Sequence, residues 1–316
     1  MMDGLYLGLD LGGTKVAVAV GDDEGNLRGK AVQPTPQGDG EAVLAGLLGA
    51  ADAACRDAGC RLDQVKAAGV GAPGPLDLGR GIVLKAPNLP SVSGFPLREK
   101  LAEGLKVPVF MDNDANVAAL GEHRLGGGRG YRDLIYITVS TGVGGGLILG
   151  GQLYRGRGAA GEIGHLIVQI DGPLCSCGNH GCLEAVASGT AMAKAAEAEL
   201  AAGEGKSSLL ANGRPATGAT VGEAAQAGDP LAGKLVARAG AFLGVALADL
   251  VNLLDPELIL IGGGVSRLGD LLLDPARAEM AGRTLGGRTC PVRVAALGGM
   301  VGAVGALVLA MDGLAG

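Results

Sequence analysis

Residues 5–20, LYLGLDLGGTKVAVAV, consist of two apolar runs joined by a glycine turn. Leu and Val dominate both runs, and Gly12-Gly13 lies between them, which predicts a strand, a tight turn and a second strand. Residues 133–149 repeat this outline, with a glycine-rich turn at 141–146 between two apolar runs. Two copies of one strand–turn–strand architecture are therefore expected along the chain.

The segments around these repeats alternate between helical and strand patterns. Residues 40–58 carry apolar side chains at helical spacing, 65–70 and 258–261 are short apolar runs typical of strands, and 185–255 is an Ala-rich stretch that predicts helix. Strands that alternate with helices indicate an α/β fold.

A glycine-rich break at 126–130 separates the two repeats, so a domain boundary is expected between 115 and 130. We place a smaller N-terminal α/β domain at 1–115, completed by a C-terminal helix at 300–316. A larger C-terminal α/β domain then occupies 116–299.

Composition narrows the class of protein. The 316 residues carry 26 Lys and Arg against 32 Asp and Glu, a net charge of −6, which disfavours nucleic acid and anionic membranes as partners. With 48% hydrophobic and 18% charged residues, the chain has enough apolar surface for a core, and disorder is not expected. The 60 glycines follow no three-residue period, which excludes collagen.

Two features bear on location. No basic segment precedes the first apolar run, so a signal peptide is not expected and the protein is placed in the cytoplasm. Residues 294–311 carry no charge and contain Gly298-x-x-x-Gly302, a pattern that a transmembrane helix could share. Because Gly298-Gly299 would break a spanning helix, we predict instead a short strand at 293–296, a turn, and a buried helix from about Met300.

Three glycine-rich turns follow apolar strands, at 12–15, 141–146 and 262–266. Consecutive backbone N–H groups in such turns can hold phosphate oxygens, although many glycine turns only reverse the chain and bind no phosphate. Neither the Walker A pattern nor the dinucleotide-binding pattern is present, since Gly13-Thr14-Lys15 has the wrong order and Arg267 stands where the last glycine would fall.

Four side chains form the strongest local signal, namely His165, Cys175, Cys177 and Cys182. One imidazole and three thiolates are the donor set of a closed, structural zinc site. His180 could replace His165 as the fourth ligand, but it lies between two of the cysteines, where the chain must already bend back. We therefore prefer His165.

Carboxylates accompany these features. Glu162 and Glu184 flank the cysteine cluster in sequence, so a metal there would bring both acids together as acceptors for the hydroxyls of a polyol; the alternative is that both are solvated surface acids. Asp112-Asn113-Asp114-Ala-Asn116 ends a predicted strand before a helix, which is a common place for active-site residues but also for a helix N-cap. Asp10, beside the first glycine turn, suggests water-mediated Mg²⁺ binding.

Taken together, these motifs resemble the ROK family of sugar kinases and regulators, and the resemblance covers nearly the whole chain. It is carried by six segments: LDLGGTK at 9–15, NDAN at 113–116, STGVGGG at 140–146, GEIGH at 161–165, CSCGNHGCLE at 175–184 and GGGVS at 262–266. The bacterial glucokinases of this family are the most similar group.

The resemblance implies a two-domain fold of the actin, Hsp70 and hexokinase type (ribonuclease H-like), with ATP in a cleft between the domains. It implies that Asp114 is the general base, that Asn113, Glu162, His165 and Glu184 bind the sugar, and that His165 also binds the structural Zn²⁺ with Cys175, Cys177 and Cys182. ATP and Mg²⁺ would be held by Asp10, Gly12, Gly13, Thr14, Lys15, Thr141, Gly142, Gly263 and Gly264.

The implied activity is ATP-dependent phosphorylation of a hexose, with glucose converted to glucose 6-phosphate. Pro87-Asn88-Leu89-Pro90 resembles a sugar-side segment of the family, which adds Asn88 to the sugar-binding residues, but Ser91-Val92-Ser93 follows where an aromatic residue is often found. Another sugar (mannose, N-acetylglucosamine or fructose) and a non-catalytic sugar-sensing regulator remain alternatives. The resemblance also implies a homodimer or homotetramer.

Overall fold

The computed structural model describes residues 4–86, 89–205, 207–211 and 213–315. Its internal contacts divide the chain into two compact units. Unit 1 consists of Met1–Gly130, Gly146–Ala160 and Ala296–Gly316, and unit 2 of Tyr131–Gly145 and Gly161–Ala295. Each unit is described by itself.

Unit 1 is built on a five-stranded mixed sheet with the order β3-β2-β1-β4-β7. The predicted strand–turn–strand unit forms β1 and β2, which are antiparallel, as are β2 and β3, and β4 and β7 continue the sheet parallel to β1. Their bounds are Leu5–Leu11 for β1, Lys15–Gly21 for β2, Leu27–Pro34 for β3, Val65–Ala72 for β4 and Val109–Asn113 for β7. A separate two-stranded sheet pairs β5 (Leu76–Asp77) with β6 (Ile82–Val83).

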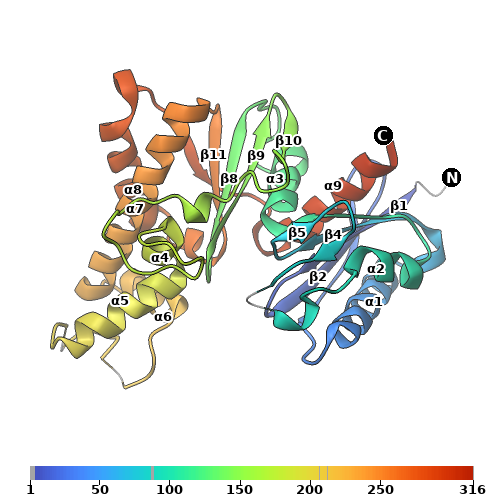
Figure 1. Ribbon diagram of the computed structural model, residues 1–316, viewed down its shortest axis with the longest axis horizontal. Coiled ribbons are helices and arrows are strands. Elements are labelled where there is room, and N and C mark those ends of the chain that lie inside the picture. The colour runs from blue at the N-terminus through green and yellow to red at the C-terminus, as the bar shows by residue number, and fades with distance from the viewer. Residues whose placement is uncertain (1–3, 87–88, 206, 212, 316) are drawn as a thin grey trace. The chain divides into compact units, whose positions relative to one another are not determined.

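Helices cover both faces of this sheet (Figure 1). On one face, α1 (Gly40–Asp57) and α2 (Leu97–Leu105) bury their apolar side chains with the strands in the main core of the unit. On the other face, α9 (Val301–Ala315) packs on β1 and β4, and α3 (Asp114–Leu125) packs along α9. The short helices η1 (Leu62–Gln64), η2 (Pro90–Val92) and η6 (Gly298–Met300) complete the unit.

Glycines allow α9 to approach its neighbours closely. A Cβ on Gly8 of β1 would lie 2.0 Å from the Ala303 carbonyl oxygen, and a Cβ on Gly305 would lie 1.6 Å from the Val117 carbonyl oxygen. Neither distance is compatible with a side chain, so these two positions require glycine.

The uncharged C-terminal segment is a core helix. By length and composition alone, α7 (Pro230–Leu254) and Gly298–Ala315 could cross a membrane, but 61% and 50% of their most apolar windows are buried within the protein. The predicted buried helix from about Met300 is confirmed, and the strand expected at 293–296 is shorter and earlier, at Val292–Val294.

The second five-stranded sheet has the order β10-β9-β8-β11-β12. Here β10 and β9 are antiparallel, and β8, β11 and β12 are parallel, so each sheet combines a strand–turn–strand unit with parallel strands. The bounds are Leu134–Val139 for β8, Val143–Leu149 for β9, Gln152–Tyr154 for β10, Leu258–Gly262 for β11 and Val292–Val294 for β12.

The Ala-rich stretch 185–255 is not one helix. Ser188, Thr217 and Asp229 each accept a hydrogen bond from a backbone N–H at a helix start, and these caps divide the stretch into separate helices. The helices of unit 2 are α4 (Leu183–Ala187), α5 (Gly189–Ala201), α6 (Gly218–Gln226), α7 (Pro230–Leu254) and α8 (Asp270–Arg283), with η3 (Ile163–His165), η4 (Gly264–Leu268) and η5 (Leu285–Gly287) between strands and helices.

The division into units differs in detail from the boundary expected at 115/116. Because α3 packs along α9, residues 116–130 group with unit 1, as do residues 146–160. The C-terminal helix groups with the N-terminal strands.

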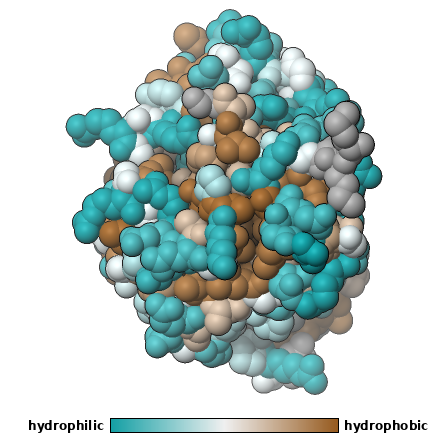
Figure 2. Space-filling model, turned by 90° about the vertical axis from the view of Figure 1, so that its right-hand side faces the viewer, coloured by the Kyte–Doolittle hydropathy of each residue, from teal (hydrophilic) through white to brown (hydrophobic). Residues whose placement is uncertain are grey.

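Some apolar side chains remain exposed. Leu27, Val32 and Leu84 of unit 1 are each about half exposed. The face drawn in Figure 2 shows hydrophilic side chains around a central apolar area. Exposed apolar atoms are common on folded proteins and by themselves indicate no function.

Candidate functional site

The first glycine turn, residues 12–14, joins β1 to β2. The turn is closed by the Gly12 N–H, which donates to the Lys15 carbonyl at 3.0 Å, and by Thr35, whose hydroxyl donates to the Gly12 carbonyl at 2.6 Å. The Lys15 ammonium donates to the Gly299 carbonyl at 3.1 Å. These contacts hold the turn beside the segment that leads into α9.

Asp10, the last polar residue of β1, lies against this same segment. A Cβ on Gly302 would be 2.4 Å from the Asp10 carboxyl carbon, so the carboxyl packs directly on the first turn of α9. Burial raises the pKa of Asp10 to about 6, although the nearby Lys15 opposes the shift. A carboxyl group beside a glycine-rich turn is a suitable place for a cation.

Asn113 and Asp114 lie where β7 ends and α3 begins. The Asn113 side-chain oxygen accepts from the N–H groups of Ala115 and Asn116, at 2.9 and 3.4 Å, and is the N-cap of α3. The Asp114 carboxylate accepts from the Ala115 N–H at 2.8 Å. The N-cap expected from the sequence is therefore present, on Asn113, and it leaves Asp114 as the first residue of the helix.

Strand register places Asp10 and this helix start at one edge of the sheet. Asp10 of β1 pairs with Gly71 of β4, and Gly71 pairs with Asp112 of β7. Neighbouring strands lie about 4.8 Å apart, so Asp10 and Asp112 are separated by about 10 Å across the carboxyl edge. Ligands of open α/β sheets bind at such edges.

Asp112 itself is buried beneath the helix start. Its carboxylate accepts from Asn116 Nδ2 at 2.8 Å and from Arg155 Nε at 2.5 Å. Asp112 and Asn116 belong to the motif noted in the sequence, but nothing in the sequence pointed to Arg155, because 43 residues separate it from its partner.

The second glycine turn, with Thr141 and Gly142, joins β8 to β9 in unit 2. The start of α5 packs on it, because the Gly189 N–H donates to the Ser140 carbonyl at 2.7 Å and the Thr190 hydroxyl donates to the Thr141 carbonyl at 2.8 Å. Thr141 is exposed, and backbone contacts rather than its own side chain hold the turn in place.

The third turn, with Gly263 and Gly264, follows β11, which is the parallel neighbour of β8. Gly263 has φ 83°, and a Cβ there would lie 2.3 Å from the Val139 carbonyl oxygen, so glycine is required. Since Gly262 pairs with Thr138, the second and third turns leave the same carboxyl edge of adjacent strands.

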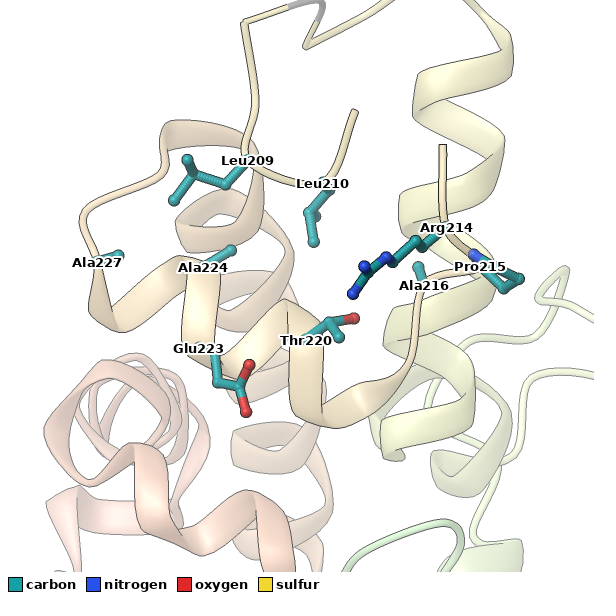
Figure 3. A pocket seen from close by; sticks show the side chains of 9 residues that line it. All are labelled: Leu209, Leu210, Arg214, Pro215, Ala216, Thr220, Glu223, Ala224 and Ala227. Carbon is teal, nitrogen blue, oxygen red and sulfur yellow. The ribbon is translucent and has the colours of Figure 1, made fainter. Parts of the chain in front are cut away.

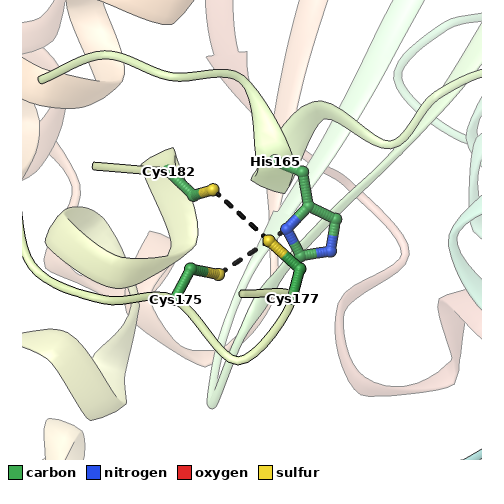
Figure 4. Close-up of side chains that lie close together, drawn as sticks. All are labelled: His165, Cys175, Cys177 and Cys182. Carbon is green, nitrogen blue, oxygen red and sulfur yellow. Dashed lines mark hydrogen bonds between the residues drawn. The ribbon is translucent and has the colours of Figure 1, made fainter. Parts of the chain in front are cut away.

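The predicted metal ligands converge in unit 2. Nδ1 of His165 lies 3.7 Å from Cys175 Sγ, and Cys177 Sγ lies 3.6 Å from Cys182 Sγ. All four donor atoms are within 4.8 Å of one another, and Figure 4 shows them turned toward a common point. By contrast, Nδ1 of His180 lies 3.1 Å from the Gly172 carbonyl oxygen, a contact outside this cluster.

This donor set fits a tetrahedral zinc ion. Ligands at about 2.0–2.3 Å from zinc are separated from one another by about 3.5–3.8 Å, which matches the two distances above. Burial, followed by the neighbouring thiols, raises the pKa of Cys182 to about 12. Such a thiol becomes a thiolate at neutral pH only beside a strong positive charge, which a divalent cation supplies.

Glu162 and Glu184 are attached to this cluster. Glu162 immediately precedes η3, and its carbonyl accepts from the His165 N–H at 3.0 Å. Glu184 is the second residue of α4, next to Leu183, and accepts from the Ser176 hydroxyl at 3.2 Å and from the Val143 N–H at 3.0 Å. Glu184 therefore links the cysteine loop to the second glycine turn. Ser176 supplies the contact from the cysteine loop, which its sequence position between two cysteines did not reveal.

A pocket of about 390 Å³ opens elsewhere in unit 2, between α6 and the loop before it (Figure 3). Its lining combines apolar side chains such as Leu210 and Ala224 with Arg214 and Glu223, and it contains none of the predicted site residues. Asn88, the remaining predicted sugar-binding residue, lies outside the described residues.

A family model described as "ROK family" matches residues 6–313. The chain belongs to the ROK family. The resemblance inferred from the sequence motifs is thus confirmed, as is the two-domain α/β fold of the actin and hexokinase type.

Several relatives of this ROK chain are named as sugar kinases. It is 39% identical over 319 residues to a glucokinase of Streptomyces coelicolor, covering 98% of each chain. It is 38% identical over 263 residues to an N-acetylmannosamine kinase of Yersinia pestis, covering 83% of each. Among solved structures, a ROK glucokinase from Streptomyces griseus in complex with glucose and AMPPNP matches with 40% identity and a TM-score of 0.85, covering 98% of this chain and 100% of that one.

Proposed function

We propose that this protein is an ATP-dependent sugar kinase that transfers the terminal phosphoryl group of ATP to the 6-hydroxyl of glucose. One observation carries the proposal. The glycine turns and the Asn113-Asp114 helix start lie at the carboxyl edges of their sheets, and a relative with 40% identity over almost the full chain was solved with glucose and an ATP analogue.

Asp114 acts as the general base. As the first residue of α3, it has its backbone fixed by the Asn113 cap, while its carboxylate accepts the proton of the attacking hydroxyl. Phosphoryl transfer has a loose transition state, so the base is expected to contribute about 10²–10⁴-fold, and most of the remaining catalysis comes from positioning and charge neutralisation.

The remaining hydroxyls of the hexose are held by Asn113, Glu162, His165 and Glu184. In this assignment Nδ1 of His165 belongs to the zinc site and Nε2 carries the proton that it donates to a sugar oxygen. Zinc, when bound, fixes the ring and its tautomer. Asn88 is retained as a further sugar contact on the sequence resemblance alone.

The nucleotide is assigned to the three turns. Backbone N–H groups of Gly12, Gly13 and Thr14, with the Lys15 charge, and those of Thr141 and Gly142 would hold phosphate oxygens, and Gly263 and Gly264 would border the adenosine. Asp10 would hold Mg²⁺ through water, which neutralises charge on the phosphates.

The identity of the sugar is the part most open to experiment. The 38% identity to an N-acetylmannosamine kinase favours a second candidate, a kinase for N-acetylmannosamine. Mannose, N-acetylglucosamine and fructose remain the alternatives considered from the sequence. A sugar-sensing regulator without turnover is disfavoured by the presence of Asp10 near the end of β1, Asp114 at the start of α3 and Thr141 in the second glycine turn.

A panel of sugars assayed with ATP and Mg²⁺ tests these candidates. We expect the highest kcat/KM for glucose. A higher value for an N-acetylated or epimeric sugar would replace glucose as the substrate, and the absence of sugar-dependent ATP consumption across the panel would leave the regulator.

For the setting of the reaction we propose a cytoplasmic homodimer or homotetramer that needs neither nucleic acid nor membrane. Light scattering coupled to size-exclusion chromatography measures the oligomer directly.

A further inference from the structure

Beneath the start of α3 lies a buried carboxylate that the proposed mechanism does not use. Asp112 is 1% exposed. One of its oxygens accepts from the Asn113 N–H and from Asn116 Nδ2, both at 2.8 Å, and the other accepts from Arg155 Nε at 2.5 Å. Asp112 therefore contacts the residues on both sides of Asp114.

Arg155 reaches this carboxylate from the loop that follows β10, within the same unit. Backbone hydrogen bonds fix the loop at Arg155, because the Arg155 carbonyl accepts from the N–H groups of Gly158 and Ala160, at 2.7 and 3.2 Å. The Arg155 side chain is 39% exposed, whereas that of Asp112 is buried, so the guanidinium is also the route by which the buried charge is neutralised.

This arrangement is expensive for stability. A buried charge loses its hydration, and its ion pair is often no more stable than apolar residues of similar volume. Here that cost falls on the Asp112 carboxylate, whose side chain is 1% exposed. In addition, Asn116 Oδ1 is buried and has no hydrogen-bond partner among the described residues, since Nδ2 of the same amide is turned to Asp112. Polar groups kept at such a cost commonly serve geometry at a functional site.

We infer that Asp112 and Arg155 are positioning residues that fix the first turn of α3 and thereby aim the Asp114 carboxylate. The inference rests on the proposed function, in which Asp114 is the base. Two anchors meet at this helix start, the Asn113 cap from the residue that precedes the helix and the Arg155 guanidinium from a distant loop, and the Asp112 carboxylate joins them.

Four variants separate positioning from simple stability: Arg155→Met, Asp112→Asn, the double variant, and Arg157→Met as the matched control. Arg157 is exposed and lies on the same loop. Arg155→Met leaves the buried carboxylate without its cation and is expected to lower both the melting temperature and kcat. A displacement of about 1 Å at a catalytic group can cost about 100-fold, so we expect a fall in kcat of about 10- to 100-fold.

The double variant gives the decisive comparison. It removes the unpaired charge, so the melting temperature should return close to that of Asp112→Asn, while kcat should stay at least about 10-fold below that of Arg157→Met because the link to the helix start is missing. Amide hydrogen exchange at Ala115 and Asn116 should be faster in Arg155→Met and in the double variant than in the control.

Two results would overturn the inference. One is a double variant that recovers kcat together with its melting temperature, which would make the pair purely structural. The other is unchanged exchange at Ala115 and Asn116 in Arg155→Met. If the unmodified enzyme phosphorylates no sugar, the proposed function fails, but the exchange measurement still decides whether Arg155 fixes the helix start.

Discussion

Replacing Asp10 by asparagine should make the ligand-free protein more stable at neutral pH while removing its activity. Asp10 packs on the first turn of α9, and burial raises the pKa of its carboxyl group to about 6. The side chain is thus held in a place that disfavours its charge. Asparagine has nearly the same shape and carries no charge.

The size and sign of the effect follow from the two pKa values. The carboxyl ionises near 3.8 in the unfolded chain and near 6 in the folded one, a difference that corresponds to about 3 kcal/mol. Between pH 3.8 and 6 the Asp10 carboxyl group is protonated in the folded state but ionised in the unfolded chain. Its contribution to the unfolding free energy is therefore complete below pH 3.8 and is lost as the pH rises toward 6. Asp10→Asn should therefore change the unfolding free energy little near pH 4 and raise it by up to about 3 kcal/mol at pH 7–8.

Urea unfolding of the wild type and Asp10→Asn at several values between pH 4.5 and 8 measures this difference, without nucleotide or Mg²⁺. Asp249→Asn, on an exposed position of α7, is the control and should show no such trend. In the presence of glucose, ATP and Mg²⁺, Asp10→Asn should lose about 100-fold or more in kcat/KM. A variant that is less stable at pH 8, or a difference that does not grow with pH, would show that burial does not disfavour the Asp10 charge.

Three further predictions concern the metal, the sugar and the packing. Purified protein should contain about one zinc per chain, and Cys177→Ser should weaken glucose binding in calorimetry more than ATP binding; metal analysis that finds none in carefully handled protein would contradict the site. Ser176→Ala removes a hydrogen bond to Glu184 and should raise the KM for glucose several-fold with little change in the KM for ATP, as steady-state kinetics would show. Gly305→Ala would place a methyl group against the Val117 carbonyl and should lower the unfolding free energy by at least about 1–3 kcal/mol in urea, so a neutral result would contradict the close packing of α9 and α3.

Most of the fold could be predicted from local patterns. The first strand–turn–strand unit and the buried C-terminal helix depend on apolar periodicity and glycine turns, which act over a few residues. The division of the Ala-rich stretch into several helices was not predicted, because Ser188, Thr217 and Asp229 are recognisable as caps only once the helix starts are known. The grouping of α3 with α9 depends on contacts between residues far apart in sequence, such as Gly305 and Val117.

The candidate site likewise contains residues that local sequence patterns predict and residues that only the fold brings into place. The four metal donors were predictable because their chemistry is specific and three of them are close in sequence, and the structure brings all four together. Arg155 and Ser176 were not predictable, since each acts through a partner that only folding brings near, Asp112 for one and Glu184 for the other. An isolated arginine or serine in a loop carries no signal of such a contact.

The central claim is that Asp114 takes the proton from a bound hexose while ATP supplies the phosphoryl group. Its most direct test is one preparation of Asp114→Asn measured twice, by a coupled assay of glucose-dependent ADP formation and by calorimetry of glucose binding. We expect turnover reduced by at least about 100-fold with a glucose Kd within a few-fold of the wild-type value. Turnover close to that of the wild type, in protein that binds glucose normally, would contradict it.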